Sequence, residues 1–152
     1  MEDIGKLVPP RVLAVAIRTA CNGWLTARRF QAHGTCVLGC GGDDSVEHYA
    51  GCAEFLRLRQ RFLGLPPPGV ARRLAVFLGL DAEDGDAALG TRNERAALNA
   101  VGVYALSRTH NAVRHGSERA EAAELFRGFL QRAVENHAKA SSLLACAGKR
   151  RR

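Results

Sequence analysis

Four residues in one short stretch, Cys36, Cys40, His48 and Cys52, follow the pattern C-x3-C-x7-H-x3-C. Cysteine thiolates and histidine imidazoles are common zinc ligands, and structural zinc sites pair them across gaps of about two to five residues. Glycines around Cys40 favour a tight turn that brings two sulfurs together, because glycine tolerates a positive φ angle. On a helix, His48 and Cys52 share one face, one turn apart. We therefore predict that the four side chains bind one structural Zn2+ ion.

The number of predicted ligands argues against a catalytic zinc. A catalytic site keeps one coordination position open for water, whereas four protein ligands close the site. We therefore expect no enzymatic activity. His33 precedes Cys36 by three residues and is a second candidate for the histidine ligand, ranked behind His48. The alternative interpretation is a set of buried thiols and a surface imidazole that bind no metal.

A second motif near these ligands is the triplet Gly42-Asp43-Asp44, which some polymerases use to hold metal ions. Such a triplet needs a hairpin between apolar strands, but here it lies between zinc ligands and Ser45, a predicted helix N-cap. We interpret Asp43 and Asp44 as favourable negative charges at a helix N-terminus.

The other two cysteines, Cys21 and Cys146, lie among apolar or small residues at helical spacing, so we predict that both are buried free thiols. The odd total of five cysteines and the lack of a secretory signal pattern argue against a disulfide framework. These features favour an intracellular, reducing compartment, the nucleus or cytoplasm, with an organelle matrix left open. Since no stretch has the apolar length of a membrane-spanning helix, we expect no membrane partner.

Helices must position the metal ligands, because composition and periodicity both predict an all-α fold. Hydrophobic residues make up 47% of the 152 residues and only 6% are aromatic, so alanine and leucine, which favour helix, supply much of the core. We predict a small helical domain with a Cys-Cys-His-Cys zinc knuckle and a C-terminal helical pair. Apolar residues recur at helical spacing in residues 11–31, 46–63, 70–80, 91–115 and 122–144.

Proline marks the clearest boundary along the chain. The run Pro66-Pro67-Pro68-Gly69 stops a helix and predicts a linker. The chain then divides into a helix, knuckle and helix (1–65), a Pro-rich linker (66–69), a helical region (70–145) and a basic tail (146–152).

Helical periodicity also predicts which side chains are buried. Trp24 and Phe30 fall on the apolar side of the first predicted helix, and we expect Trp24 in the core. Arg59 is expected nearer the surface with its neighbouring arginines. Arg108, Asn111 and His115 fall near one side of a predicted helix, which indicates an exposed polar face with some potential to bind phosphate.

The sequence carries a formal net charge of +7, and four of these charges belong to the tail residues Lys149, Arg150, Arg151 and Arg152. The tail is typical of a nucleic-acid contact or a nuclear-import signal, and equally of a solvated chain end. Arg28, Arg29 and Arg57 lie near the predicted knuckle and are candidate phosphate contacts to RNA or DNA. A solvated basic helix face is the alternative for Arg28 and Arg29, which share the first predicted helix with Arg11 and Arg18.

The ligand pattern, with Asp44-Ser45-Val46-Glu47-His48 before the last cysteine, resembles the zinc-binding segment downstream of the polymerase in non-LTR retrotransposon reverse transcriptases. The segments LTARRFQAHGTC and VYALSRTHNAVRHG resemble flanking helical sequence in that family. Here the paired ligands are separated by x3 and x3, whereas the family commonly has x2 and x4. The sequence holds no YxDD-type motif, so the resemblance implies a zinc domain detached from the polymerase. In the family this region helps to hold template RNA or target DNA.

Two functions of different classes follow. The first is a structural zinc module that contacts nucleic acid, derived from or belonging to a retroelement reverse transcriptase and without polymerase activity of its own. The second is a helical structural subunit or adaptor that docks into a larger protein or ribonucleoprotein assembly. The strong apolar stripe of residues 122–144 favours the second.

Overall fold

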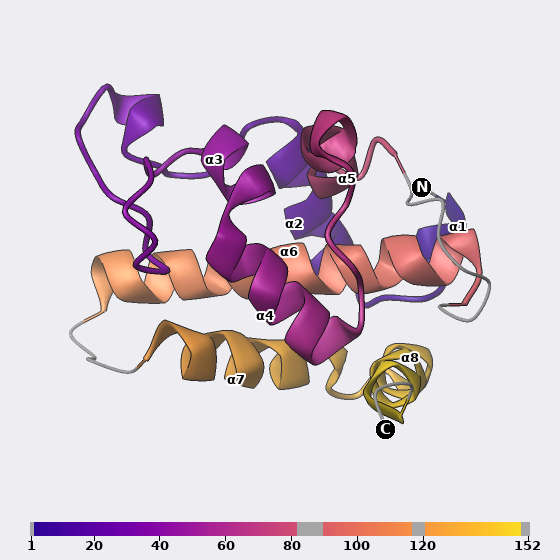
Figure 1. Cartoon of the computed structure of the whole chain (residues 1–152). Coiled ribbons are helices and arrows are strands. Elements are labelled where there is room, and N and C mark those ends of the chain that lie inside the picture. The colour runs from indigo at the N-terminus through magenta and orange to yellow at the C-terminus, as the bar shows by residue number, and fades with distance from the viewer. Residues whose placement is uncertain (1, 82–89, 117–120, 150–152) are drawn as a thin grey trace.

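The longest helix, α6 (Arg92–His115), runs through the middle of the molecule, and the other helices pack around it (Figure 1). It begins with a capping box, in which the Thr91 side chain accepts from the Glu94 N–H group and the Glu94 carboxylate accepts from the Thr91 N–H group. This reciprocal pair satisfies two backbone donors that a helix start leaves open. The predicted span of 91–115 therefore agrees with the helix in the structure.

The computed structural model describes residues 2–81, 90–116 and 121–149. These residues are mostly helical and form no β-strand, with one isolated antiparallel bridge between Thr35 and Asp43, so the predicted all-α fold is confirmed. Within them, every helix is too short or too polar to cross a lipid bilayer. The remaining elements are α1 (Glu2–Gly5), α2 (Pro10–Ala20), the 3-10 turn η1 (Arg28–Phe30), α3 (Val46–Gly51), α4 (Ala53–Leu63), the 3-10 turn η2 (Val70–Arg72), α5 (Arg73–Phe77), α7 (Ala122–Val134) and α8 (Ala138–Lys149).

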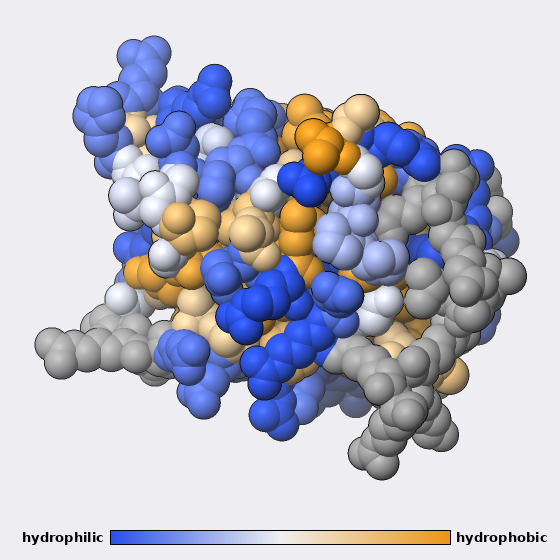
Figure 2. Space-filling model, in the orientation of Figure 1, coloured by the Kyte–Doolittle hydropathy of each residue, from blue (hydrophilic) through white to orange (hydrophobic). Residues whose placement is uncertain are grey.

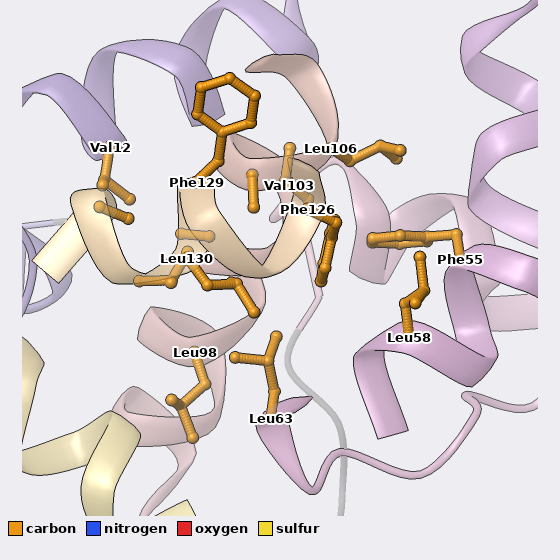
Figure 3. Packing of buried hydrophobic residues seen from close by; sticks show 14 of the residues in the cluster. Val12, Phe55, Leu58, Leu63, Leu98, Val103, Leu106, Phe126, Phe129 and Leu130 are labelled. Carbon is orange, nitrogen blue, oxygen red and sulfur yellow. The ribbon is translucent and has the colours of Figure 1, made fainter. Parts of the chain in front are cut away.

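Helix α7 lies along α6 and buries its apolar face in the same core (Figures 1 and 3). Phe126 contacts the rings of Phe55 and Phe62 from α4, with centroids 6.2 and 6.1 Å apart. The Arg11 guanidinium of α2 donates to three carbonyl groups at the end of α7, at 2.7, 3.3 and 3.0 Å. A cation at that end complements the helix dipole.

Side chains on both sides of the Pro-rich segment belong to one cluster of buried residues, which includes Leu63, Leu65 and Phe77. Arg59 lies inside this region with only 2% of its surface exposed, so its predicted position nearer the surface is wrong. Its guanidinium donates to the Pro66 carbonyl at 3.1 Å and ties the Pro-rich segment to α4.

Three predicted helices are shorter than expected because the backbone breaks inside them. The helix predicted over 11–31 ends at Ala20, and Asn22 then adopts a left-handed conformation with φ 50°. The helix predicted over 46–63 is divided at Cys52, whose ψ of 119° is extended. The helix predicted over 122–144 is divided between α7 and α8, where Asn136 has φ 60°. Asparagine tolerates this conformation better than most residues because its short polar side chain bonds locally.

These breaks change the exposure of several side chains. Trp24 is buried as predicted, but in a loop, whereas Phe30 is 62% exposed on η1. Cys21 and Cys146 are exposed, so the prediction of buried thiols is wrong. Of the predicted helix 70–80, only η2 and α5 form, and Leu80 is exposed.

Candidate metal centre

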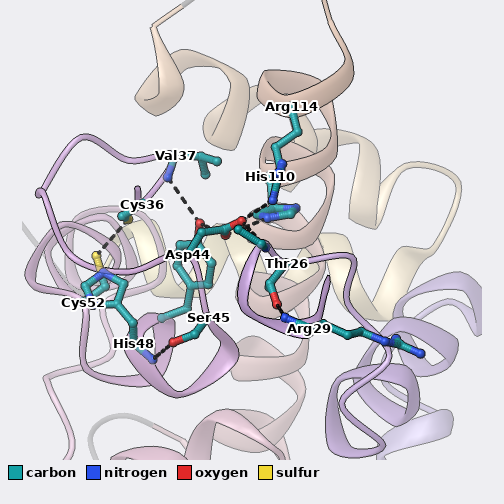
Figure 4. Close-up of polar contacts among 12 residues, drawn as sticks. Thr26, Arg29, Cys36, Val37, Asp44, Ser45, His48, Cys52, His110 and Arg114 are labelled. Carbon is teal, nitrogen blue, oxygen red and sulfur yellow. Dashed lines mark hydrogen bonds and ion pairs between the residues drawn. The ribbon is translucent and has the colours of Figure 1, made fainter. Parts of the chain in front are cut away.

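The structure brings the predicted ligands Cys36, Cys40, His48 and Cys52 together, and their ligand atoms all lie within 4.8 Å of one another. The Sγ atom of Cys52 is 3.8 Å from that of Cys36 and 3.6 Å from that of Cys40. Nε2 of His48 is 3.1 Å from Sγ of Cys40. The cluster joins two pairs of residues that are separated along the chain, Cys36 with Cys40 and His48 with Cys52. Figure 4 shows Cys36, His48 and Cys52.

These distances fit a tetrahedral metal ion better than they fit a disulfide. With a zinc–sulfur bond of about 2.3 Å, two sulfurs on a tetrahedron are about 3.8 Å apart. A disulfide bond is much shorter, at about 2.05 Å, and all five cysteines of the chain are free thiols. The group could therefore hold a metal ion, and three thiols with one imidazole are a donor set typical of structural zinc.

The first ligand pair is held by a tight turn of the backbone. The N–H group of Cys36 donates to the Gly42 carbonyl at 2.8 Å, and the Gly39 N–H group donates to the Cys36 carbonyl at 3.0 Å. Gly39 and Gly41 have φ angles of 78° and 79°, which side chains rarely adopt. The predicted glycine turn is therefore present, and it directs Cys40 back toward the other sulfurs.

The second ligand pair lies on and just after α3. Ser45 caps this helix as predicted, since its Oγ atom accepts from the His48 N–H group at 3.0 Å. Cys52 is the junction between α3 and α4, and its N–H group donates to the Tyr49 carbonyl at 3.4 Å. The last turn before the break thus keeps the two ligands on one side.

The hydrogen-bonded thiols of Cys36 and Cys52 favour a state in which one of the two is a thiolate. A hydrogen bond with Cys52 lowers the pKa of the Cys36 thiol to about 5, against the opposing effect of burial. The same bond, together with burial, raises the pKa of Cys52. Since the thiolate is the form that binds metal, the cluster already favours one ligand in its binding form.

Behind the ligands, Asp44 is buried and all its bonds point into the protein (Figure 4). Its Oδ1 atom accepts from the Tyr49 hydroxyl and His110 Nε2, both at 2.9 Å. Its Oδ2 atom accepts from the Ala27 N–H group at 2.8 Å and from the Arg114 guanidinium. Asp44 directly precedes Ser45, the N-cap of α3, as predicted, and its carboxylate has the additional role of joining the knuckle to α6.

The environment of Asp44 favours the carboxylate form. Burial alone would raise its pKa, but hydrogen bonds from Ala27 and Tyr49 and the adjacent His110 outweigh burial and lower the pKa. Burial raises the pKa of Tyr49, so the hydroxyl stays protonated and donates a hydrogen bond to Asp44. The Tyr49 oxygen also accepts from the Val37 N–H group at 3.2 Å, which ties the turn after Cys36 to the same network.

His110 was not singled out as a buried residue by the sequence, yet it is only 1% exposed. Its ring lies 5.7 Å from that of Trp24 and 5.8 Å from that of Tyr49, measured between centroids. The aromatic cluster and the bond to Asp44 explain its burial. The neighbouring residues Arg108 and His115 are exposed and Asn111 is half-buried, as expected for a polar face of this segment, and Arg114 is one-third exposed.

The predicted nucleic-acid contacts lie on different elements. Arg28 and Arg29 are adjacent on η1, where Arg28 is 4.0 Å from Glu47. Arg57 lies on α4 and is paired with Glu54 at 2.7 Å. Lys149 ends α8, and Arg150, Arg151 and Arg152 lie outside the described residues.

Two surface hollows border the knuckle, one on each side. The first, of about 300 Å³, is lined by η1 and the turn and includes Arg28, His33 and Asp43. His33 therefore lies in this hollow, while the ligand cluster uses His48. The second, of about 270 Å³, includes Leu38 and Arg57. Both hollows place an arginine beside the ligand-bearing turn.

In comparisons with known proteins, no family model, curated protein or solved structure matches the chain. The resemblance to retroelement reverse transcriptases therefore stays a prediction from the sequence.

Proposed function

We propose that Cys36, Cys40, His48 and Cys52 bind one structural zinc ion that fixes the turn against α3. The sulfur–sulfur distances of 3.8 and 3.6 Å carry this proposal, because they are close to the spacing of about 3.8 Å between sulfurs around tetrahedral zinc. Cys36 and Cys52 are buried, whereas Cys40 is exposed and His48 is half-buried, so the ion would be shielded from water on one side. Binding free energy at such a site contributes directly to folding.

Metal analysis of the purified chain tests the zinc proposal. We expect about one zinc per chain, and Cys52→Ser should lose both the zinc and much of the thermal stability. Cys21→Ser and Cys146→Ser are matched controls, since both thiols are exposed and lie outside the cluster. Zinc content that is unchanged in Cys52→Ser would contradict the proposal.

We further infer that this zinc module contacts nucleic acid and derives from, or belongs to, a retroelement reverse transcriptase, without polymerase activity of its own. The net charge of +7 and the arginines beside the knuckle support the nucleic-acid contact. Arg28 is the best placed, since its side chain is 66% exposed and its nearest carboxylate is 4.0 Å away. The ligand pattern supports the retroelement origin.

Salt dependence tests the nucleic-acid contact. Phosphate contacts release counterions, so the affinity of the zinc-loaded chain should fall steeply as salt rises. Arg28→Ala should reduce the slope of log K against log salt by about one unit. Arg127→Ala removes the same charge from an exposed position on α7 and serves as the control. Binding that is insensitive to salt would contradict the inference.

Exposed apolar side chains on and beside α5 favour the second candidate, an adaptor that docks into a larger assembly. Val70 is 77% exposed, Leu80 71% and Leu74 42%. Figure 2 shows hydrophobic side chains at the surface in this region. The stripe of α7, in contrast, is buried in the protein's own core. Size-exclusion chromatography of the chain with and without RNA would separate the two functions.

A further inference from the structure

We propose that η1 presents Phe30 as a stacking platform for an unpaired base, with Arg28 and Arg29 beside it to contact the flanking phosphates. The ligand is single-stranded nucleic acid. This inference rests on the proposed nucleic-acid function and specifies its ligand. The contacts predicted from the sequence were arginine and lysine side chains only, and Phe30 adds an aromatic ring next to Arg28 and Arg29 on η1.

The exposure of Phe30 needs an explanation. Its side chain is 62% exposed, although burial of a phenylalanine ring stabilises a folded protein. The chain contains a nearby core that holds Trp24 at 3% exposure, yet the break after α2 places Phe30 outside it. Single apolar side chains are common on protein surfaces, but an exposed aromatic ring beside two arginines offers a nucleic-acid strand both a stacking face and positive charge.

Hydrogen bonds fix the turn that carries the ring. The Phe30 and Ala32 N–H groups both donate to the Ala27 carbonyl, at 3.0 and 2.9 Å. The Ala27 N–H group donates to the buried Asp44 carboxylate at 2.8 Å, and the Arg28 N–H group donates to the Asp44 carbonyl at 3.3 Å. The platform is therefore ordered before binding, which reduces the entropy that a ligand contact would cost.

The charges beside the ring match a nucleic-acid backbone. Arg28 is mostly exposed and has only a long contact to Glu47. The Arg29 guanidinium donates to the Asn22 and Trp24 carbonyls at 3.2 and 3.4 Å, so its position is defined, and Figure 4 shows it extending away from the Asp44 network. Asp43 and Asp44 line the hollow beside Arg28 and would repel a phosphate inside it. Phosphates should therefore follow η1 rather than enter the hollow.

A single strand fits this surface better than a duplex. Every unpaired base exposes a π-face that can stack on an aromatic ring, with little dependence on sequence. In a duplex those faces are covered by neighbouring base pairs, and a protruding ring would have to separate them. A duplex can contact Arg28 and Arg29, but it gains little from Phe30.

Binding of the full zinc-loaded chain to labelled oligo(U) RNA, oligo(dT) DNA and a matched duplex tests the proposal. Phe30→Ala should weaken binding to the single strands by about 5- to 150-fold and leave duplex affinity unchanged. The salt slope should stay as in the wild type, because no phosphate contact is removed. Phe30→Tyr keeps the ring and should retain single-strand affinity. Urea unfolding should show no loss of stability in either variant, since the side chain is exposed.

Phe30→Trp gives a direct signal of stacking. The chain's own tryptophan, Trp24, is buried, so a tryptophan at position 30 adds an exposed fluorophore. Its emission should be quenched by single strands and not by the duplex. If the wild type binds but Phe30→Ala loses nothing on single strands, the stacking platform is wrong while the nucleic-acid contact stands. If the wild type binds none of the three ligands, the proposed function itself fails.

Discussion

The substitution Gly42→Ala should weaken metal binding by displacing one ligand, the His48 ring. A Cβ atom at residue 42 would lie 2.1 Å from Cε1, 2.5 Å from Nδ1 and 2.9 Å from Nε2 of His48. An ordinary contact needs about 3.4 Å, so the imidazole would have to retreat by about 1.3 Å. Metal–ligand distances vary by only about 0.2 Å, so the moved ring could not remain a ligand. The three atoms nearest to the new methyl group all belong to this ring, so the ring takes the closest contact.

The expected loss follows from the number of ligands. Structural zinc binds peptides with about 10–16 kcal/mol, and one ligand in four accounts for about 3 kcal/mol of this if the four contribute equally. That corresponds to about a 100-fold weaker affinity. Competition with a chromogenic chelator would measure the affinity, and far-UV circular dichroism of the metal-free form would confirm the fold.

Gly51→Ala is the matched control for this experiment. It lies in α3 between His48 and Cys52, and a Cβ atom there would meet nothing within 4 Å. It should bind zinc as the wild type does and gain up to about 1 kcal/mol of stability from the better helix former. Wild-type zinc affinity in Gly42→Ala would refute the close approach of the His48 ring that underlies the predicted site.

Two further predictions concern the contacts that join distant helices. Asp44→Asn leaves His110 and Arg114 without their carboxylate and should destabilise the fold by about 3 kcal/mol, measured by urea unfolding. Because the pKa of Asp44 is lowered from 3.8 in the folded state, its contribution is present above about pH 4 and is lost as the pH falls below 3.8. The free energy of unfolding should therefore fall less steeply below pH 4 in Asp44→Asn than in the wild type, and equal slopes would contradict the assignment. Arg11→Ala removes the cation at the end of α7 and should lower stability by about 1 kcal/mol, whereas an unchanged midpoint in urea would show that these exposed bonds contribute nothing.

The features that the sequence predicted best are those set by neighbours along the chain. The four ligands were found from their residue types and gaps, and the structure places their donor atoms together. Helix α6 was predicted nearly to the residue from its apolar spacing and from the glycine after His115, and the structure adds a local capping box between Thr91 and Glu94 at its start. Such signals act within one or two turns of the backbone.

The breaks in the first and last predicted helices had local signals in the sequence, but the regular spacing of apolar residues outweighed these signals. Asn22 is followed by Gly23, a pair typical of turns, and Asn136 interrupts an otherwise regular apolar stripe. In both places the apolar spacing continued past the break and favoured one long helix. As a consequence Phe30 was placed on the apolar side of a helix, whereas the turn after Asn22 leaves its ring in water.

The burial of Asp44 and His110 could not be predicted from local patterns. The two residues are 66 positions apart in the chain and form their bond only after α6 packs behind the knuckle. Each residue taken alone is typical of a polar surface. Arg59 is a similar case, since its burial depends on the Pro-rich segment folding back over α4.

The bond between Asp44 and α6 also determines how far the knuckle is autonomous. Many small zinc motifs fold as independent cassettes that can be moved between proteins. Here a peptide that ended before α6 would bury a carboxylate without His110 and Arg114 and would expose one side of Tyr49. The smallest segment that folds is therefore larger than the ligand motif. A knuckle moved into another protein would need the second half of α6 with it to keep its structure.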